Sequence, residues 1–222
     1  MKNLSFVIVI FLTSTISKAQ NMRYDTIRYA KEHYLERVAL FKNESTQKGR
    51  VVFLGNSIIE FEDWKTLLKD STVINRGIAG DNTFGVLDRL EDVISLQPGK
   101  LFIEIGINDI SQNIPVEIVV KNIYTISKRV KAKSPKTKIY IFSILPTNDN
   151  VKDNYPDAYN KSAETNSVNR HLKQKAAEGG FTYLDLNSTI KDNNGKLDKI
   201  YADPDGLHLN SNGYQLLLKL LP

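Results

Sequence analysis

Short runs of β-branched and large apolar residues recur along the chain, separated by stretches with apolar residues at helical spacing. Runs that are apolar throughout are typical of strands buried on both faces, as in a parallel sheet. Such strands are predicted at residues 50–54, 73–75, 101–105, 139–143 and 181–185. Helices are predicted at residues 24–42, 62–69, 83–96, 116–133, 158–177 and 211–221.

This alternation of strands and helices predicts an α/β fold, a three-layer α/β/α sandwich around a five-stranded parallel sheet. Pro135 and the Gly179-Gly180 pair follow two of the helices, where helix ends are expected. No internal repeat or interdomain linker interrupts the pattern. We therefore expect one domain over residues 50–222, preceded by a helix and a polar link at residues 20–49 that pack on it.

The first 19 residues have the composition of a separate unit. Lys2 precedes an apolar stretch at residues 4–16 that is too short to span a bilayer comfortably, and Ser17 and Ala19 place small residues before Gln20. We predict a cleaved signal peptide at residues 1–19, with a short membrane anchor as the alternative. Cleavage would make the protein secreted or periplasmic, without stable membrane insertion.

The composition excludes several kinds of functional site but does not identify one. The chain has 222 residues and no cysteine, which excludes disulfides, thiolate metal sites and a cysteine nucleophile. Its formal charge of +5 is spread along the sequence rather than gathered in a basic block. A nucleic-acid partner is therefore not expected. The oligomeric state is not indicated.

Polar residues that could take part in catalysis follow the predicted strands. The first strand ends in Gly55-Asn56-Ser57, so that a sharp turn would present the Ser57 hydroxyl at the carboxyl edge of the sheet. Ligands and catalytic groups collect at this edge in open α/β sheets. Ser57 is therefore a candidate nucleophile, provided that other parts of the chain supply a base and an oxyanion site.

The loops after the second and third strands contain candidate donors. Gly77 and Gly80 precede a helix start, so the loop there is expected to expose backbone N–H groups that bind an anion. Asn108 follows the third strand and offers a side-chain amide as a fixed donor. Viewed alone, each motif is more often a turn with a helix cap than a binding site.

A carboxylate and a histidine lie three residues apart near the end of the chain. One turn between Asp205 and His208 lets the carboxylate orient the imidazole and leaves the other ring nitrogen free as a base. His33 and His171 lie in helical stretches and are expected at the surface. A metal site at His208 is the competing hypothesis, but it lacks further ligands in a chain without cysteine.

Together these segments resemble the SGNH hydrolases, also called the GDSL esterase family, which have a flavodoxin-like α/β/α fold. Gly55-Asn56-Ser57-Ile58 resembles the nucleophile block, with Asn56 where the family name implies Asp. The segments 78–81, 106–109 and 205–208 resemble the glycine, G-x-N-D and D-x-x-H blocks. Ile59 stands where the G-x-S-x-G elbow of ordinary α/β-hydrolases has its second glycine.

The resemblance implies a serine esterase with Ser57, Asp205 and His208 as catalytic residues. It also implies an oxyanion hole built from the N–H groups of Ser57 and Gly80 and the side chain of Asn108, with no cofactor and no metal. The similarity to platelet-activating-factor acetylhydrolase-like enzymes and carbohydrate O-acetylesterases favours acetyl or other short-chain esters of a small molecule or glycan. A lysophospholipase or thioesterase and a non-catalytic glycan-binding protein are the alternatives. Aromatic residues near the predicted loops are candidate substrate contacts, namely Trp64, Tyr155, Tyr159 and Tyr201.

Overall fold

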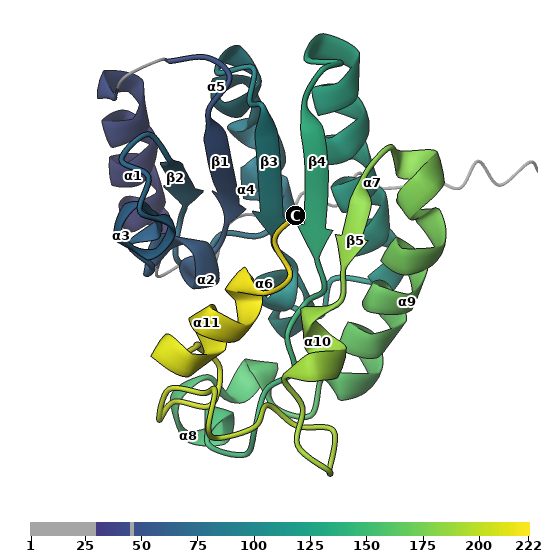
Figure 1. Cartoon of the computed structure of the whole chain (residues 1–222). Coiled ribbons are helices and arrows are strands. Elements are labelled where there is room, and N and C mark those ends of the chain that lie inside the picture. Colours follow the sequence, from purple (N-terminus) through teal and green to yellow (C-terminus); the bar gives the residue numbers. More distant parts are fainter. Residues whose placement is uncertain (1–29, 45–46) are drawn as a thin grey trace, which may run out of the picture.

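Five parallel strands form the centre of the structure, a computed structural model that describes residues 30–44 and 47–222 (Figure 1). They are β1 (Val51–Gly55), β2 (Ile74–Gly77), β3 (Lys100–Glu104), β4 (Lys138–Phe142) and β5 (Thr182–Leu184). Their order in the sheet is β2-β1-β3-β4-β5, and every neighbouring pair is parallel. The predicted strands are therefore confirmed, with ends that differ by one or two residues. The predicted signal peptide lies outside the described residues.

Helices cover both faces of this sheet and confirm the three-layer prediction. One layer contains α4 (Thr83–Asp88), α5 (Leu90–Ser95), α7 (Val116–Lys133) and α9 (Ser162–Gly179). The other contains α3 (Trp64–Leu68), α10 (Leu186–Thr189) and α11 (Ser211–Leu218). Helix α7 has the bounds that its apolar periodicity predicts.

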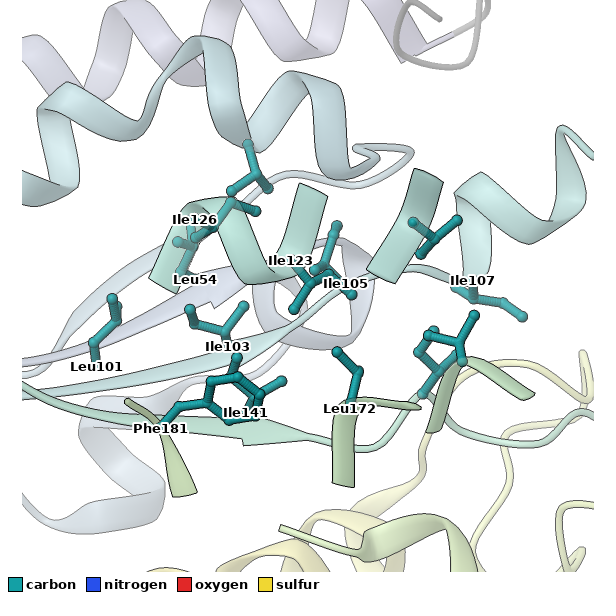
Figure 2. Packing of buried hydrophobic residues seen from close by; sticks show 14 of the residues in the cluster. Leu54, Leu101, Ile103, Ile105, Ile107, Ile123, Ile126, Ile141, Leu172 and Phe181 are labelled. Carbon is teal, nitrogen blue, oxygen red and sulfur yellow. The ribbon is translucent and has the colours of Figure 1, made fainter. Parts of the chain in front are cut away.

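Successive side chains of each strand point to opposite faces of the sheet, so alternate residues pack against the two helical layers. Leu54, Leu101 and Ile103 pack toward α7 and α9, where Ile123 and Leu172 meet them (Figure 2). On the opposite face, aromatic rings stack across the strands. The ring centroids of Phe53 and Trp64 are 3.8 Å apart, and those of Phe53 and Phe102 are 4.9 Å apart. Both faces are dry because every residue in these contacts is buried.

The single helix predicted at residues 83–96 is wrong, because the structure has two helices that meet at Arg89. The Arg89 guanidinium donates to the Asp81 carboxylate, on the loop before α4, and to the carbonyl of Gly55, the last residue of β1. Apolar periodicity does not register such a break, since both halves keep their buried face. Other elements were not predicted from the sequence: α2 (Ser57–Glu60), α6 (Ile107–Ser111), α8 (Val151–Asn154), α10 and the 3-10 segment at Pro156–Ala158.

The strand order explains where a ligand site is to be expected. From β1 the chain crosses to β2 on one side, and β3 then lies on the other side of β1. Ligands bind in the crevice outside the carboxyl ends of the strands at such a switch point. Ser57 follows β1 and Asn108 follows β3, so the crevice lies between these two residues.

Helix α1 (Lys31–Asn43) lies beside β2 at the edge of the sheet (Figure 1). The Tyr34 hydroxyl donates to the Gly85 carbonyl over 2.9 Å, which ties α1 to α4. Phe41 is buried, and the guanidinium of Arg76 lies 4.5 Å from the centre of its ring. Among the described residues, no helix combines the length and the apolar character needed to cross a membrane.

Candidate active site

The turn after β1 is held by close packing and by an Asx cap. A Cβ atom on Gly55 would lie 2.0 Å from the Glu104 carbonyl oxygen, so only glycine lets β1 and β3 approach here. The Asn56 side chain accepts a hydrogen bond from the Ile58 N–H over 2.9 Å and starts α2. Ser57 is therefore the first residue of a short helix, with its hydroxyl at the carboxyl edge of the sheet.

Three predicted catalytic side chains lie in one hydrogen-bonded row. The Ser57 Oγ atom is 2.8 Å from the Nε2 atom of His208, and the Nδ1 atom of His208 is 2.5 Å from a carboxylate oxygen of Asp205. Ser57 is 8% exposed and His208 is 6% exposed. Because the carboxylate only accepts, Nδ1 carries the proton, and the lone pair of Nε2 faces the hydroxyl. This is the arrangement that a general base needs.

The electrostatics of Asp205 suit this orientation. Burial by itself would raise the pKa of the Asp205 carboxyl, but hydrogen bonds from the His208 ring and from the N–H groups of His208 and Leu207 outweigh it. The pKa therefore lies below its ordinary value of 3.8. The carboxylate stays ionised and keeps the imidazole in one tautomer.

The loop that carries His208 is fixed on two sides. The Asp203 N–H donates to the His208 carbonyl over 2.8 Å, and Asn148 donates to the Gly206 carbonyl over 2.9 Å. Gly206 has a φ of +78°, and a Cβ atom there would meet Asn148. The aromatic rings of Phe61 and Tyr155 lie 5.2 Å and 5.6 Å from the imidazole ring. Backbone bonds and ring contacts thus limit the movement of the base.

The predicted oxyanion donors face the same space as the Ser57 hydroxyl. Ser57 begins α2 and Gly80 has a φ of +78°, and neither N–H has an acceptor in the described part of the chain. Asn108 follows β3 and is 8% exposed. One hydrogen of its amide bonds the Asp81 carbonyl over 2.8 Å, which leaves the second hydrogen of that nitrogen for a ligand.

A buried ion pair braces the loop between β2 and α4. Arg89 and Asp81 are both buried, and the Arg89 Nε atom lies 2.9 Å from the carboxylate. The same guanidinium reaches the Gly55 carbonyl over 3.1 Å, and the Ile78 N–H donates to that carbonyl over 3.0 Å. The turn that carries the nucleophile and the loop that carries Gly80 are therefore joined directly.

A cavity of about 280 Å³ opens above these groups. Its lining contains Ser57, Gly80, Asn108 and His208, together with Ala30, His33, Phe61, Ala79, Tyr155 and Leu207. A second cavity of about 380 Å³ shares Asn108, Tyr155 and Leu207 with it and adds polar side chains at Ser111, Gln112, Asn154 and Asp157. The two spaces therefore adjoin along a common wall.

Two carboxyl groups beneath the site are fully buried. Burial raises the pKa of Glu104 to about 8 and that of Asp109 to about 7. The Asn56 amide partly offsets the rise at Glu104, although Asn56 Nδ2 has no well-aligned acceptor among the described residues. Hydrogen bonds from Thr83 to the Asp109 carboxylate likewise lower its pKa and offset part of the rise that burial causes. The sequence did not single out either carboxyl group.

The aromatic candidates differ in their positions. Tyr155 lines both cavities, whereas Trp64 is 1% exposed and stacks in the core. Tyr159 and Tyr201 pack against the buried cores on the two opposite faces of the sheet, and neither contributes to the lining of the two cavities. Phe61, which was not among the predicted substrate contacts, is an exposed aromatic residue beside His208. A phenylalanine four residues after Ser57 was the signal available in the sequence.

The histidines outside the row are partly exposed, as predicted, but His33 has a role that the sequence did not indicate. Its side chain lines the catalytic cavity, and its Nε2 atom lies 2.8 Å from the Glu60 carboxylate. His171 contacts the Ser167 carbonyl on α9, away from these residues. Within residues 30–44 and 47–222, no group of three or more acidic or histidine side chains is placed to hold a metal ion.

Known proteins with similar sequences indicate the family to which this chain belongs. Residues 53–216 match the family described as GDSL-like lipase/acylhydrolase. A curated relative, platelet-activating factor acetylhydrolase IB subunit alpha2 from Rattus norvegicus, is 27% identical over 177 residues, covering 77% of this chain and 73% of the relative. The N-acylneuraminate cytidylyltransferase of Escherichia coli is 30% identical over 179 residues, which are 79% of this chain but only 40% of that protein.

Solved structures agree with these matches. A structure from Streptococcus pneumonia, whose name refers to platelet activating factor, superposes with a TM-score of 0.77 at 27% identity, covering 87% of this chain and 92% of that one. A GDSL-like lipase from Bacteroides thetaiotaomicron superposes with a TM-score of 0.73 at 25% identity, covering 84% and 94%. The similarity thus extends over most of the described fold and includes the strand ends where Ser57, Gly80 and Asn108 lie.

Proposed function

Because the chain belongs to the GDSL-like lipase/acylhydrolase family, we propose that it is an exported serine esterase that removes short acyl groups, acetyl first among them. One observation carries the proposal. The Asp205–His208–Ser57 row and three candidate oxyanion donors surround a single cavity. Nucleophile, base, orienting carboxylate and oxyanion donors are the groups that acyl transfer requires.

In the first half of the reaction, the Ser57 Oγ atom attacks the ester carbonyl carbon while its proton moves to His208 Nε2. The carbonyl oxygen becomes an oxyanion, which accepts hydrogen bonds from the N–H groups of Ser57 and Gly80 and from the Asn108 amide. The bond to the leaving oxygen then breaks, and His208 returns the proton to the departing alcohol. Ser57 is left as an acyl ester.

In the second half, water attacks the acyl carbon and gives a proton to His208. The same three donors stabilise the second tetrahedral intermediate, and the acid leaves as the Ser57 hydroxyl regains its proton from the imidazole. Asp205 stays ionised throughout and stabilises the imidazolium that forms in each half.

The size of the catalytic cavity supports a short acyl group. At about 280 Å³ it is slightly smaller than most ligand pockets, which range over roughly 300–1,000 Å³. An acetyl group occupies little of this space, so part of the alcohol fits beside it. Relatives named as acetylhydrolases point to the same acyl group.

A sugar is the leaving group that the adjoining cavity favours. Polar side chains at Ser111, Gln112, Asn154 and Asp157 offer hydrogen-bond partners, and Tyr155 offers an aromatic face. One relative carries the name of an N-acylated sugar acid. Carbohydrate O-acetyl esters therefore come first among substrates.

A lipid ester, as for a lysophospholipase or thioesterase, is the second candidate. Phe61 is 61% exposed beside His208 and would contact an apolar chain. The curated relatives named for platelet-activating factor favour it as well. A protein that binds glycans without catalysis is the remaining hypothesis, and measured turnover of any ester would contradict it.

The decisive experiment measures acetate release from acetylated mono- and polysaccharides, beside acyl-lipid and acyl-thioester panels of increasing chain length. We expect the highest kcat/KM with acetylated sugars and no turnover by Ser57→Ala. Faster hydrolysis of long-chain lipid esters would select the second candidate. Affinity for glycans in a protein without turnover of any ester would support the binding hypothesis instead.

Export rests on the sequence of residues 1–19 and has its own test. Expression of the full chain in a bacterial host, followed by mass measurement of the protein from periplasm and medium, is expected to show a chain that begins near Gln20. An uncleaved chain in the membrane fraction would support an anchor. An uncleaved chain in the cytoplasm would contradict export.

A further inference from the structure

Helix α1 precedes the residues matched by the family, 53–216, yet it borders the catalytic cavity. His33 contributes to the lining of that cavity. Tyr34 donates to the Gly85 carbonyl, and an Arg37 nitrogen donates to the Gly77 carbonyl over 3.2 Å. These contacts dock α1 on the segments before and after Gly80.

Glu60 is the point where α1 meets the catalytic loops. It ends α2, three residues after Ser57, and its side chain is 12% exposed. The carboxylate accepts a hydrogen bond from the Ala79 N–H and contacts His33 Nε2 at 2.8 and 2.9 Å. Arg37 Nε lies 3.3 Å from it as an ion pair. One carboxylate thus joins the nucleophile helix, the glycine loop and α1.

The bond to Ala79 determines how the next N–H is presented. Asp81 N–H donates to the Ile78 carbonyl over 3.0 Å, which closes a turn whose third residue, Gly80, has a φ of +78°. Holding the Ala79 N–H against Glu60 fixes this turn relative to α2. This orients the Gly80 N–H relative to the Ser57 N–H, and within residues 30–44 and 47–222 neither N–H has an acceptor.

Charge explains why α1 is needed as well. A carboxylate so close to the oxyanion site would oppose negative charge that develops there, since like charges interact strongly in a partly buried site. Arg37 places a permanent positive charge against Glu60, and its side chain is 21% exposed. The pair holds the loop while adding little net charge near the oxyanion.

We propose that Glu60, contacted by His33 and balanced by the charge of Arg37, both on α1, is a positioning residue for the oxyanion hole, so that α1 is part of the active site. The proposal rests on the proposed function, since it assigns the Ser57 and Gly80 N–H groups to the oxyanion. Glu60 itself does not touch the reacting atoms. Its effect is on the geometry of the transition state, and binding of the neutral ester depends on it much less.

The test compares Glu60→Ala, Glu60→Gln and Arg37→Ala with wild type on 4-nitrophenyl acetate, together with the affinity for a small boronic acid that forms a tetrahedral anion on Ser57. We expect Glu60→Ala to lower kcat about 10- to 100-fold with KM within about threefold, since misplacement by about 1 Å costs up to about 10²-fold. Boronic acid affinity should fall in parallel with kcat. Glu60→Gln retains an acceptor for the Ala79 N–H and should recover most of the loss. Arg37→Ala should lower kcat by a smaller factor.

Glu91→Ala is the matched control, because Glu91 is an exposed carboxylate paired with Arg129 and Lys133 away from the cavity. It should leave kcat and boronic acid affinity unchanged. A kcat for Glu60→Ala within twofold of wild type would overturn the inference. A rise in KM without a fall in kcat would overturn it as well. If Glu60→Ala does not fold, unchanged kcat and unchanged boronic acid affinity of Arg37→Ala overturn it. The proposed function fails separately, if Ser57→Ala keeps the wild-type rate.

Discussion

The Nε2 atom of His208 lies 2.8 Å from the Oγ atom of Ser57, although 151 residues separate the two along the chain. Groups that act as one unit in catalysis lose their function together. We therefore predict that Ser57→Ala and His208→Ala each lower kcat by roughly 10⁴- to 10⁶-fold and that the double variant is no slower than the worse single variant. Active-ester hydrolysis at high enzyme concentration measures this. Multiplying losses would show that the two residues act independently.

Asp205→Asn tests the orientation of the imidazole. An amide in place of the carboxylate favours the tautomer with the proton on Nε2, which cannot accept the Ser57 proton, so kcat should fall about 10⁴-fold. Asp203→Asn, two residues earlier, is the control and should leave kcat nearly unchanged. Because the pKa of Asp205 is lowered in the fold, its stabilisation is present above the ordinary value of 3.8 and is lost as pH falls through the lowered value. Acid unfolding of Asp205→Asn should lack this component.

Asn108→Ala removes a donor from the oxyanion hole. We expect kcat to fall about 10²- to 10³-fold with a small change in KM, since the donor acts mainly on the transition state. Asn122→Ala is the control, because Asn122 is a buried amide on α7 that bonds the Thr83 hydroxyl instead. That variant should lose stability and keep its kcat. Equal kinetic losses in the two variants would argue for a structural role of Asn108.

Glu104→Gln should change how stability depends on pH. The folded pKa of about 8 lies above the ordinary 4.5, so between these values the folded state holds a proton that the unfolded chain has released. Wild-type stability therefore falls as pH rises from about 4.5 to 8, a loss that the glutamine variant lacks. Urea unfolding of both proteins from pH 5 to 8 measures this. The free energy of unfolding of Glu104→Gln should increase relative to that of wild type as the pH rises. Parallel curves would contradict the raised pKa.

Asn56→Asp restores the residue implied by the family name but places it beside Glu104. Asn56 is fully buried, and two adjacent carboxyl groups disfavour ionisation of each other. We expect a loss in the free energy of unfolding on the order of 1–3 kcal/mol near pH 8 and a smaller loss near pH 5. A double-mutant cycle with Glu104→Gln should recover part of the loss. An additive cycle would mean that the two side chains do not interact.

Much of the fold follows from local pattern. The five strands and α7 have the positions that apolar runs and helical spacing predict, because burial on both faces leaves a direct mark on composition. The break at Arg89 left no such mark, and the contact of its side chain with Asp81 on a different loop is not visible in local spacing. The short helices α2 and α6 were missed because each is a single turn that follows a strand.

The sequence by itself determined which residues are candidates for catalysis. They stand in motifs whose order and spacing are visible in the chain, namely Ser57, Gly80, Asn108, Asp205 and His208. Only the tertiary structure decided what surrounds them. The contacts of Glu60 with Ala79, His33 and Arg37, the place of Phe61 beside His208 and the two adjoining cavities all join segments far apart in sequence. Such contacts depend on strand order and on how helices pack at the sheet edge, and neither local periodicity nor motif spacing encodes them.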